Sequence, residues 1–333
     1  MRFLIKTFGL LLVLGLVLAT AALAWGHFNI RRIRPAMPAL AEVTQPDRGL
    51  ELPVRLSYVN TASQRMPRSA VLDPDLDPAP DAGYVMSHPS FVVEWQDGRI
   101  FLVDLGMDAG AAIDFGLPME MVVGAEPIEP HEATSIALGE HRRRVAGIGF
   151  THMHSDHTSG LAKLCSDLIP PIPGSTPIPV FEHHNQLSQV NHTTRGAKAE
   201  VQAAGCVEIR SLGFESGLLP IPGFPGLYAI PAAGHTPGST MYVVQLRTYP
   251  GGSEGFHDDV ETWVITGDVV NHYQGIERGI RKPPLYSLLV VPENDEQLST
   301  VRDFLAQLSR KPGVKLLVNH DRNQIEATGL KPY

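Results

Sequence analysis

Residues 151–160 read Thr-His-Met-His-Ser-Asp-His-Thr-Ser-Gly, and this stretch decides how the chain is interpreted. It directly follows the apolar run 145–150, which predicts a short buried strand. Four side chains that can bind a metal lie within six positions: His152, His154, Asp156 and His157. Imidazole and carboxylate together suit zinc, iron or manganese rather than a soft metal that needs thiolates. Because the chain has only 14 histidines in 333 residues, chance does not explain this grouping, and we predict a metal site here.

Three later apolar runs end in further side chains of the same kind. His235 follows one run inside a Gly-His-Thr-Pro-Gly turn, Asp268 follows the next, and His320 follows the last. Singly, a histidine or aspartate after a strand is usually solvated or caps a helix. Together with the first group these residues supply five histidines and two aspartates, which is enough for two metal ions.

The apolar runs predict an α+β fold. Residues 90–95 and 99–104 flank an Asp-Gly pair, which is the strongest short-range signal for a β-hairpin. Asn294 followed by Gln297 resembles a helix start, and apolar residues then recur at helical spacing up to Leu308. A helix is also expected after Arg195. Further strands are expected at 52–59, 145–150, 179–181, 206–212, 227–231, 240–246, 262–266 and 314–318. Strands come first and are then interleaved with helices, without simple βαβα alternation, which favours an α+β or layered αββα body in one domain.

The motif His152-x-His154-x-Asp156-His157, followed in order by His235, Asp268 and His320, resembles the signature of the metallo-β-lactamase-fold hydrolase superfamily. The resemblance covers roughly residues 50–325. It implies a four-layer αββα sandwich, with loops at one edge of the sheets holding the metals.

The resemblance also implies a role for each ligand. One metal would be bound by His152, His154 and His235, and the second by Asp156, His157 and His320, with Asp268 bridging the two. Two divalent ions, Zn²⁺ first and Fe or Mn as alternatives, would share a water and bring its pKa toward neutrality, so that a metal-bound hydroxide attacks a carbonyl. The remaining nine histidines lack this context and are not assigned to the site: His27, His88, His131, His141, His183, His184, His192, His257 and His272.

Four residues are expected to assist this chemistry. Asp156 would act on protons or orient the hydroxide besides binding metal, and Tyr273 would donate a hydrogen bond to the developing oxyanion. Asp104 and Asp321 would orient metal-binding histidines from behind.

Differences between this sequence and the patterns of individual branches of the family limit which reaction we expect the protein to catalyse. No cysteine occupies a ligand position, unlike true antibiotic-degrading β-lactamases, and His154 replaces the glutamate of flavodiiron relatives. Residues 87–106 look like the start of N-acyl-homoserine lactonases, although Asn271 stands where those enzymes have a tyrosine. The ligand set is equally similar to that of glyoxalase II thioesterases, but the chain has only 13 residues after His320 instead of a helical domain. We therefore predict an ester or lactone hydrolase, with a glyoxalase II-like thioesterase and a non-catalytic metal-binding module as alternatives.

The first 25 residues predict a signal peptide or membrane anchor. Arg2 and Lys6 precede an apolar, uncharged stretch that runs to Trp25, and Ala22-Leu23-Ala24 has the form of a cleavage site. The stretch is also long enough to span a bilayer as a slightly short helix. We expect an exported, periplasmic or extracytoplasmic protein, with a linker at 26–50 and the hydrolase domain at 51–333.

Charge and cysteine content limit the partners and the stabilising bonds. The net charge is 27 − 35 = −8, which argues against nucleic acid as a partner and leaves a small-molecule substrate. Cys165 and Cys206 could form a disulfide, but a domain of this size does not need one, and we expect both to be small apolar core residues.

Overall fold

The structure is a computed structural model and describes residues 2–31, 33–35, 37–45, 51–168, 176–188, 193–213, 217–248 and 259–333. Part of the predicted linker (residues 46–50), His192 and His257 lie outside these described residues.

The first sheet is built on the predicted hairpin. β2 (Gly83–Glu94) and β3 (Ile100–Val103) pair antiparallel, with Phe91 opposite Val103, and Gly98 of the connecting turn has a φ of 85° that favours glycine. β5 (Val145–Gly149) pairs parallel to β3, β6 (Ile178–Glu182) pairs parallel to β5, and β7 (Val207–Ser211) pairs parallel to β6. The order of the sheet is β13 (Lys331–Pro332), β1 (Arg55–Pro67), β2, β3, β5 (Val145–Gly149), β6 (Ile178–Glu182) and β7 (Val207–Ser211), with β4 (Glu129–Pro130) paired to β1.

The second sheet contains the later strands. Its order is β12 (Val314–Leu317), β11 (Asp259–Ile265), β10 (Thr240–Thr248), β9 (Leu227–Pro231) and β8 (Leu219–Pro220). Both β9 and β11 run antiparallel to β10, and β12 is parallel to β11. The carboxyl ends of β9, β11 and β12 therefore lie at the same edge of this sheet, so the residues that follow them are brought together.

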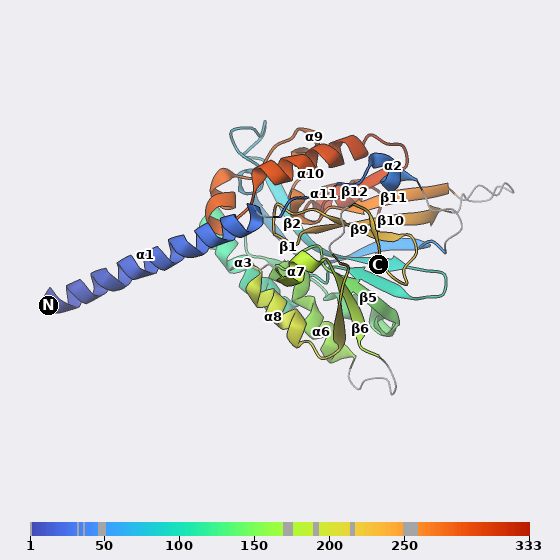
Figure 1. The fold of residues 1–333 in the computed structure, drawn as a ribbon, viewed down its shortest axis with the longest axis horizontal. Coiled ribbons are helices and arrows are strands. Elements are labelled where there is room, and N and C mark those ends of the chain that lie inside the picture. Colours follow the sequence, from blue (N-terminus) through green and yellow to red (C-terminus); the bar gives the residue numbers. More distant parts are fainter. Residues whose placement is uncertain are drawn as a thin grey trace.

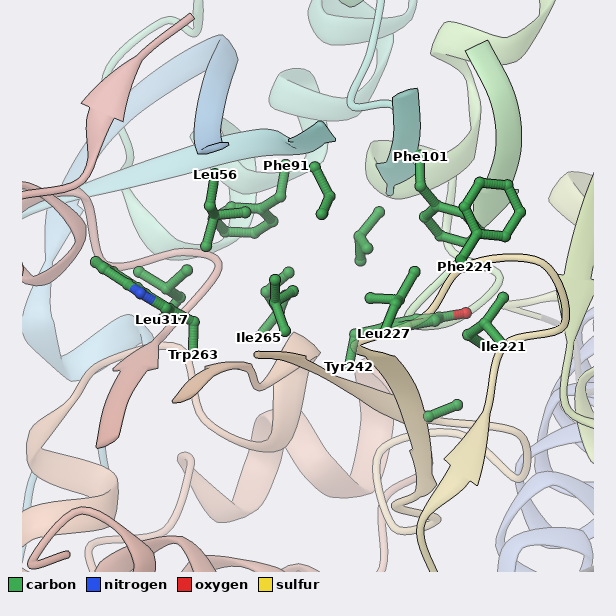
Figure 2. Packing of buried hydrophobic residues seen from close by; sticks show 14 of the residues in the cluster. Leu56, Phe91, Phe101, Ile221, Phe224, Leu227, Tyr242, Trp263, Ile265 and Leu317 are labelled. Carbon is green, nitrogen blue, oxygen red and sulfur yellow. The ribbon is translucent and has the colours of Figure 1, made fainter. Parts of the chain in front are cut away.

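The two sheets pack face to face, and alternation along each strand determines which residues lie between them. Phe91 and Phe101 of the first sheet meet Leu227, Tyr242 and Trp263 of the second (Figure 2). The neighbouring positions along the same strands point to the opposite face, since side chains alternate across a strand. Val92, Ile100 and Leu102 accordingly belong to a separate buried cluster on the outer face of the first sheet.

Helices cover both outer faces and complete the four layers of the predicted αββα sandwich (Figure 1). Leu161 and Leu164 of α6 (Gly160–Asp167) and Val201 of α8 (Arg195–Ala203) pack on the first sheet. α10 (Asp295–Leu308) packs on the second sheet, and its N-cap Asn294 accepts a hydrogen bond from the backbone of Gln297, as predicted. The other helices are α1 (Arg2–Arg31), α2 (Leu40–Thr44), α3 (Ala109–Val123), α4 (Thr134–Ala137), α5 (Ser155–Thr158), α7 (His184–Ser188), α9 (Gln274–Glu277) and α11 (Arg322–Ala327), with short 3-10 turns at Arg68–Ala70, Gly139–Arg144 and Gly267–Val269 and a π-helical turn at Tyr286–Val290.

Two elements differ from the sequence-based expectations. β1 runs on to Pro67 rather than ending at Val59, because a bulge between Asn60 and Ser63 lets the strand keep pairing with β2. α3 was not expected, since it contains Gly116 and Pro118. Gly116 is required there because a Cβ would lie 2.6 Å from Ile128.

The expectation of two unpaired cysteines is wrong. Cys165 of α6 and Cys206, at the start of β7, form a disulfide across a Cα–Cα distance of 5.4 Å. Both cysteines pack against the cluster on the outer face of the first sheet, a proximity that their separation of 41 residues in the sequence does not reveal.

One described helix is long and apolar enough to cross a membrane, over Lys6–Ile30 with a mean hydropathy of 2.4, a test that signal sequences also pass. This helix, α1, continues through residue 25 to Arg31, so its last turns lie in the region predicted as a linker. The same region contains α2, whose Val43 is fully buried against the second sheet.

Candidate metal centre

The four clustered ligand candidates lie on one short piece of chain after β5. His152 and His154 stand on the turn between β5 and α5, and α5 carries Asp156 and His157. His152, Asp156 and His157 are buried, whereas His154 is partly exposed. The site therefore has a buried floor and one ligand near solvent.

Asp104, at the end of β3, holds this turn in place. Its carboxylate accepts hydrogen bonds from the backbone N and Oγ1 of Thr151 at 2.7 and 2.9 Å, and from Nδ2 of Asn319 at 2.9 Å. Asp104 has a φ of 60°, in the left-handed region that aspartate tolerates better than most residues. One buried carboxylate thus joins the ends of β3, β5 and β12.

Three imidazoles form what we call the three-histidine group: His152, His154 and His235. The distance from His152 Nε2 to His154 Nδ1 is 2.9 Å, and His235 Nε2 lies 3.2 and 3.1 Å from those two atoms. Nitrogens that bind one tetrahedral zinc at about 2.0–2.1 Å stand roughly 3.3 Å apart. The spacing of the three nitrogens therefore fits a single ion.

The remaining four side chains form the carboxylate group: Asp156, His157, Asp268 and His320. His320 Nε2 lies 2.9 Å from Asp268 Oδ2 and 3.5 Å from Asp156 Oδ2. His157 Nε2 lies 3.4 Å from an oxygen of each aspartate. Asp268 Oδ2 is also 3.6 Å from His235 Nε2, so Asp268 stands between the two groups. The structure thus brings all seven candidates together.

Hydrogen bonds behind the ligands fix which ring nitrogen faces the centre. His157 Nδ1 donates to Asp104 Oδ2 at 2.9 Å, and His320 Nδ1 donates to the carbonyl of Ser87 at 2.7 Å. With the proton on Nδ1, Nε2 of each ring is left as a ligand. The predicted orienting contact of Asp104 with a histidine is confirmed. Asp321 instead caps α11 and accepts from the backbone of Tyr273, so that expectation is wrong.

His235 is held by a buried ion pair that the sequence did not reveal. Its Nδ1 donates to Glu293 Oε1 at 2.5 Å, which leaves Nε2 facing the other two histidines. Lys282 Nζ lies 2.7 Å from the same carboxylate oxygen and donates to the backbone carbonyl of Asp268 at 2.8 Å. Ser287 Oγ donates to the other oxygen of Glu293 at 2.5 Å. Lys282 and Glu293 are separated from His235 by 47 and 58 residues, so no local signal could have assigned them.

The charge states of the site follow from burial and neighbours. Burial, reinforced by the nearby His235 ring, lowers the pKa of His154 to about 3, and burial also lowers the pKa of His152 well below its usual range. Burial alone would raise the pKa of Asp156, but the adjacent His157 and its hydrogen bonds outweigh it and hold that pKa well below the ordinary value. Burial alone would also raise the pKa of Asp268, but the nearby His320 outweighs it and holds that pKa well below the ordinary value. Burial would lower the pKa values of His157 and His320, but the adjacent aspartates outweigh it and raise both. Metals bind neutral imidazoles and ionised carboxylates, so these two rings would release a proton when an ion binds.

Two buried atoms show that the donor set fits a cation. Among the residues that the structure describes, His157 Nε2 and Asp268 Oδ1 have no hydrogen-bond partner, although each is fully enclosed. Leaving buried polar atoms unpaired costs about 1–3 kcal/mol each unless something binds them. Both atoms point to the centre of the carboxylate group, 3.4 Å apart. A divalent ion would satisfy both.

His88, which the sequence analysis set aside, lies in the same cluster. Its Nδ1 is 3.2 Å from Asp156 Oδ2, and its ring meets that of His320 edge-on at 5.1 Å between centroids. With Asp156 and His320 it forms a further trio able to hold an ion. His88 lies on β2 beside Ser87, whose backbone N donates to the carbonyl of His320. Ser87 and His320 are 233 residues apart in the sequence, so no local signal could have assigned His88 to the site.

Two tyrosines differ in their relation to the centre. The side chain of Tyr273 packs against the apolar cluster that contains Val270 and Ile276, and no described hydrogen bond joins it to a ligand. Tyr286 stands over Lys282, with 5.7 Å between Nζ and the ring centroid. Burial raises the pKa of Tyr286 well above its usual value, as does the negative charge of Glu293 and of the two site aspartates.

A family model for the metallo-beta-lactamase superfamily matches residues 83–249, half of the chain. The chain belongs to this superfamily. The matched segment includes the clustered ligands and His235, while Asp268 and His320 lie beyond it. Membership and the His/Asp clusters identify the protein as a metal-dependent hydrolase of the metallo-beta-lactamase fold. A search among curated proteins finds no match.

Several solved structures of this fold are similar to the chain. One is an N-acyl homoserine lactone hydrolase with N-hexanoyl-L-homoserine bound at its catalytic metal center, at 15% identity and a TM-score of 0.57, covering 83% of this chain and 96% of that one. Another is a quorum-quenching N-acyl homoserine lactone lactonase, at 13% identity and a TM-score of 0.57, covering 83% and 95%. A third is AidC, a dizinc quorum-quenching lactonase, at 13% identity and a TM-score of 0.50, covering 80% and 87%. These similarities show a shared fold.

Proposed function

We propose that the protein is a dinuclear metal-dependent hydrolase that opens a lactone or a similar ester. The observation that carries this proposal is the pair of adjoining ligand groups, with Asp268 reaching both. Imidazole and carboxylate donors suit Zn²⁺, with Fe or Mn as alternatives. Two ions bound at such a site would bring the pKa of a shared water toward about 7 and polarise the carbonyl under attack.

The chain's own residues would then orient the substrate and move protons. Asp156, ionised and adjoined by His88, is placed to hold a proton or orient the attacking oxygen as well as to bind metal. Tyr273 remains our sequence-based candidate for the hydrogen bond to the developing oxyanion. Tyr286 is a second candidate, because it borders the Lys282 side of the centre.

A lactone is the favoured substrate for two reasons. Residues 87–106 resemble the beginning of N-acyl-homoserine lactonases, and solved lactonases share the fold. A hydrolysis screen with defined metal content tests the proposal with lactones, thioesters, phosphotriesters and β-lactams. Lactone cleavage that a chelator abolishes is the expected result. Activity on thioesters alone would favour the glyoxalase II-like alternative, and no turnover on any class would favour the non-catalytic metal-binding module.

The amount of bound metal tests whether the site holds two ions, independently of catalytic turnover. We expect about two ions per chain, one for the three-histidine group and one for the carboxylate group. His235→Ala should empty the three-histidine group and leave about one ion, whereas Asp268→Ala should weaken both. Full metal content in Asp268→Ala would contradict the bridging role.

We also propose that α1 anchors an exported body in the membrane. Disulfides persist in oxidising compartments, so the Cys165–Cys206 bond supports export. The end of α1 and the chain just after it are held by the body. Gln297 Nε2 donates to the carbonyls of Ile30, in α1, and of Ile33, after it, and Ile30 is fully buried. Amino-terminal sequencing of the membrane fraction tests this. A start at the original amino terminus supports the anchor, and a start after Ala24 would indicate a cleaved signal.

A further inference from the structure

Exposed large hydrophobic side chains gather on two segments of the body. Outside α1, nine such side chains are exposed among the described residues, and seven of them lie on α3 or on residues 285–290. Their exposed fractions reach 84% at Met121 and 70% at Leu285. Single exposed apolar residues are normal, but a contiguous group marks an interaction surface. The seven are Ile113, Leu117, Met121, Val122, Leu285, Leu288 and Val290, which we call the apolar face.

The two segments of the apolar face adjoin one another. Met119 and Val123 of α3 pack in the same cluster as Ile280, which lies just before the second segment. α1 joins the body at the second segment, where His27 Nε2 lies 3.1 Å from the carbonyl oxygen of Leu288. α1 accordingly leaves the molecule beside α3 and the segment after α9 (Figure 1).

The final turns of α1 have the composition of a helix at a membrane surface. Trp25 and Phe28 are each 56% exposed, with 6.4 Å between their ring centroids. Such aromatic residues are enriched where a spanning helix meets the headgroup layer. Because His27, between these two residues, contacts Leu288, the depth of the aromatic pair also sets the depth of residues 285–290. A bilayer crossed by α1 would lie against the apolar face.

We propose that the apolar face is a lipid-contact surface, which dips its exposed side chains into the bilayer crossed by α1. The proposal rests on the proposed membrane anchor. α3 carries Asp114 and Glu120 and no lysine or arginine, so apolar insertion rather than attraction to anionic lipid must provide the contact. Zwitterionic phosphatidylcholine is therefore the appropriate lipid for the test.

The experiment measures the depth of single side chains in the full-length protein reconstituted into phosphatidylcholine vesicles. Leu288→Cys and Met121→Cys are labelled with an environment-sensitive fluorophore. Gln307→Cys is the control: it is exposed on α10, ten residues after the residue that contacts Ile30, and thus about 15 Å farther along the helix. Each variant must keep the metal content of the unsubstituted chain.

We expect blue-shifted emission at positions 288 and 121 that falls when lipids with a nitroxide near the headgroup are included, and no such loss at 307. Water-like emission at 288 and 121 in protein that floats with the vesicles would overturn the proposal while leaving the anchor intact. Blue-shifted emission that nitroxide lipids do not quench would show that protein, and not lipid, covers the apolar face. That result would also overturn the proposal. Failure of the chain to float with vesicles would instead refute the anchor.

Discussion

Two glutamates are equally buried in this protein, yet they carry opposite charge states. Glu293, behind His235, and Glu182, at the end of β6, both have 6% or less of their surface exposed. Burial would raise the pKa of Glu293, but Lys282 and His235 outweigh it and lower that pKa to about 2. Burial raises the pKa of Glu182 to about 8, and Lys198 opposes this only in part. Glu293 is therefore ionised at neutral pH and Glu182 is protonated.

The two glutamates differ in pKa because of their hydrogen-bond partners and not because of how deeply they are buried. Both oxygens of Glu293 accept hydrogen bonds, from His235, Lys282 and Ser287. In the described part of the chain, neither oxygen of Glu182 has a hydrogen-bond partner. A buried charge is tolerated only when it is paired and hydrogen-bonded. The ionised glutamate is the one that the metal centre uses, since it holds the proton of His235 away from the ligand nitrogen.

Removing Lys282, the cationic partner of Glu293, should produce the largest loss of stability. Lys282→Met leaves a carboxylate buried without its cation, and we expect a loss of about 3–5 kcal/mol in the free energy of unfolding. Chemical denaturation of the chelator-treated protein measures this without a contribution from metal. Arg322→Met is the control, because its side chain is 44% exposed and pairs with Glu326, itself 48% exposed, and an exposed ion pair of this kind contributes about 1 kcal/mol or less.

The same pair offers a sharper version of this test. In the double variant Lys282→Met, Glu293→Gln neither charge remains, so much of the lost stability should return. A double variant as unstable as Lys282→Met alone would mean that packing around the lysine, and not the charge of Glu293, accounts for the loss.

The charge of Glu293 should matter to metal binding even where the fold survives. Glu293→Gln keeps the shape but removes the charge that holds the proton on His235 Nδ1. Loss of such a supporting partner typically costs about 10–100-fold in metal affinity, and we expect this loss at the three-histidine group. Competition with a chromophoric chelator measures it, with Glu296→Gln as an exposed control on α10. Equal affinities in both variants would show that Glu293 does not orient His235.

The sequence predicted those features whose signal is local. The hairpin 90–104, the capped helix after Asn294 and the clustered ligands 152–157 each depend on residues close together in the chain, and the structure contains the hairpin, the helix and the cluster. Lys282, Glu293 and His88 could not be assigned in this way, because only strand pairing and loop packing bring them to the ligands. The disulfide was missed for the same reason. α3 was missed because packing against Ile128 overrides the helix-weakening effect of its glycine and proline.

The unpartnered Glu182 should give the smallest effect on stability near pH 5, and this effect should grow as the pH rises. Between about pH 4.5, the ordinary value, and about pH 8, folded Glu182 keeps a proton that the unfolded chain has released. Stability should therefore fall as the pH rises through this window, by at most about 1.4 kcal/mol per pH unit, and level off above it. Glu182→Gln cannot titrate, so it should match the parent near pH 5 and exceed it increasingly at pH 6, 7 and 8 in urea unfolding. Glu208→Gln, exposed on the neighbouring strand β7, should leave the pH profile unchanged. A constant difference between Glu182→Gln and the parent across all four pH values would mean that Glu182 is not held neutral, and the contrast between the two buried glutamates would not hold.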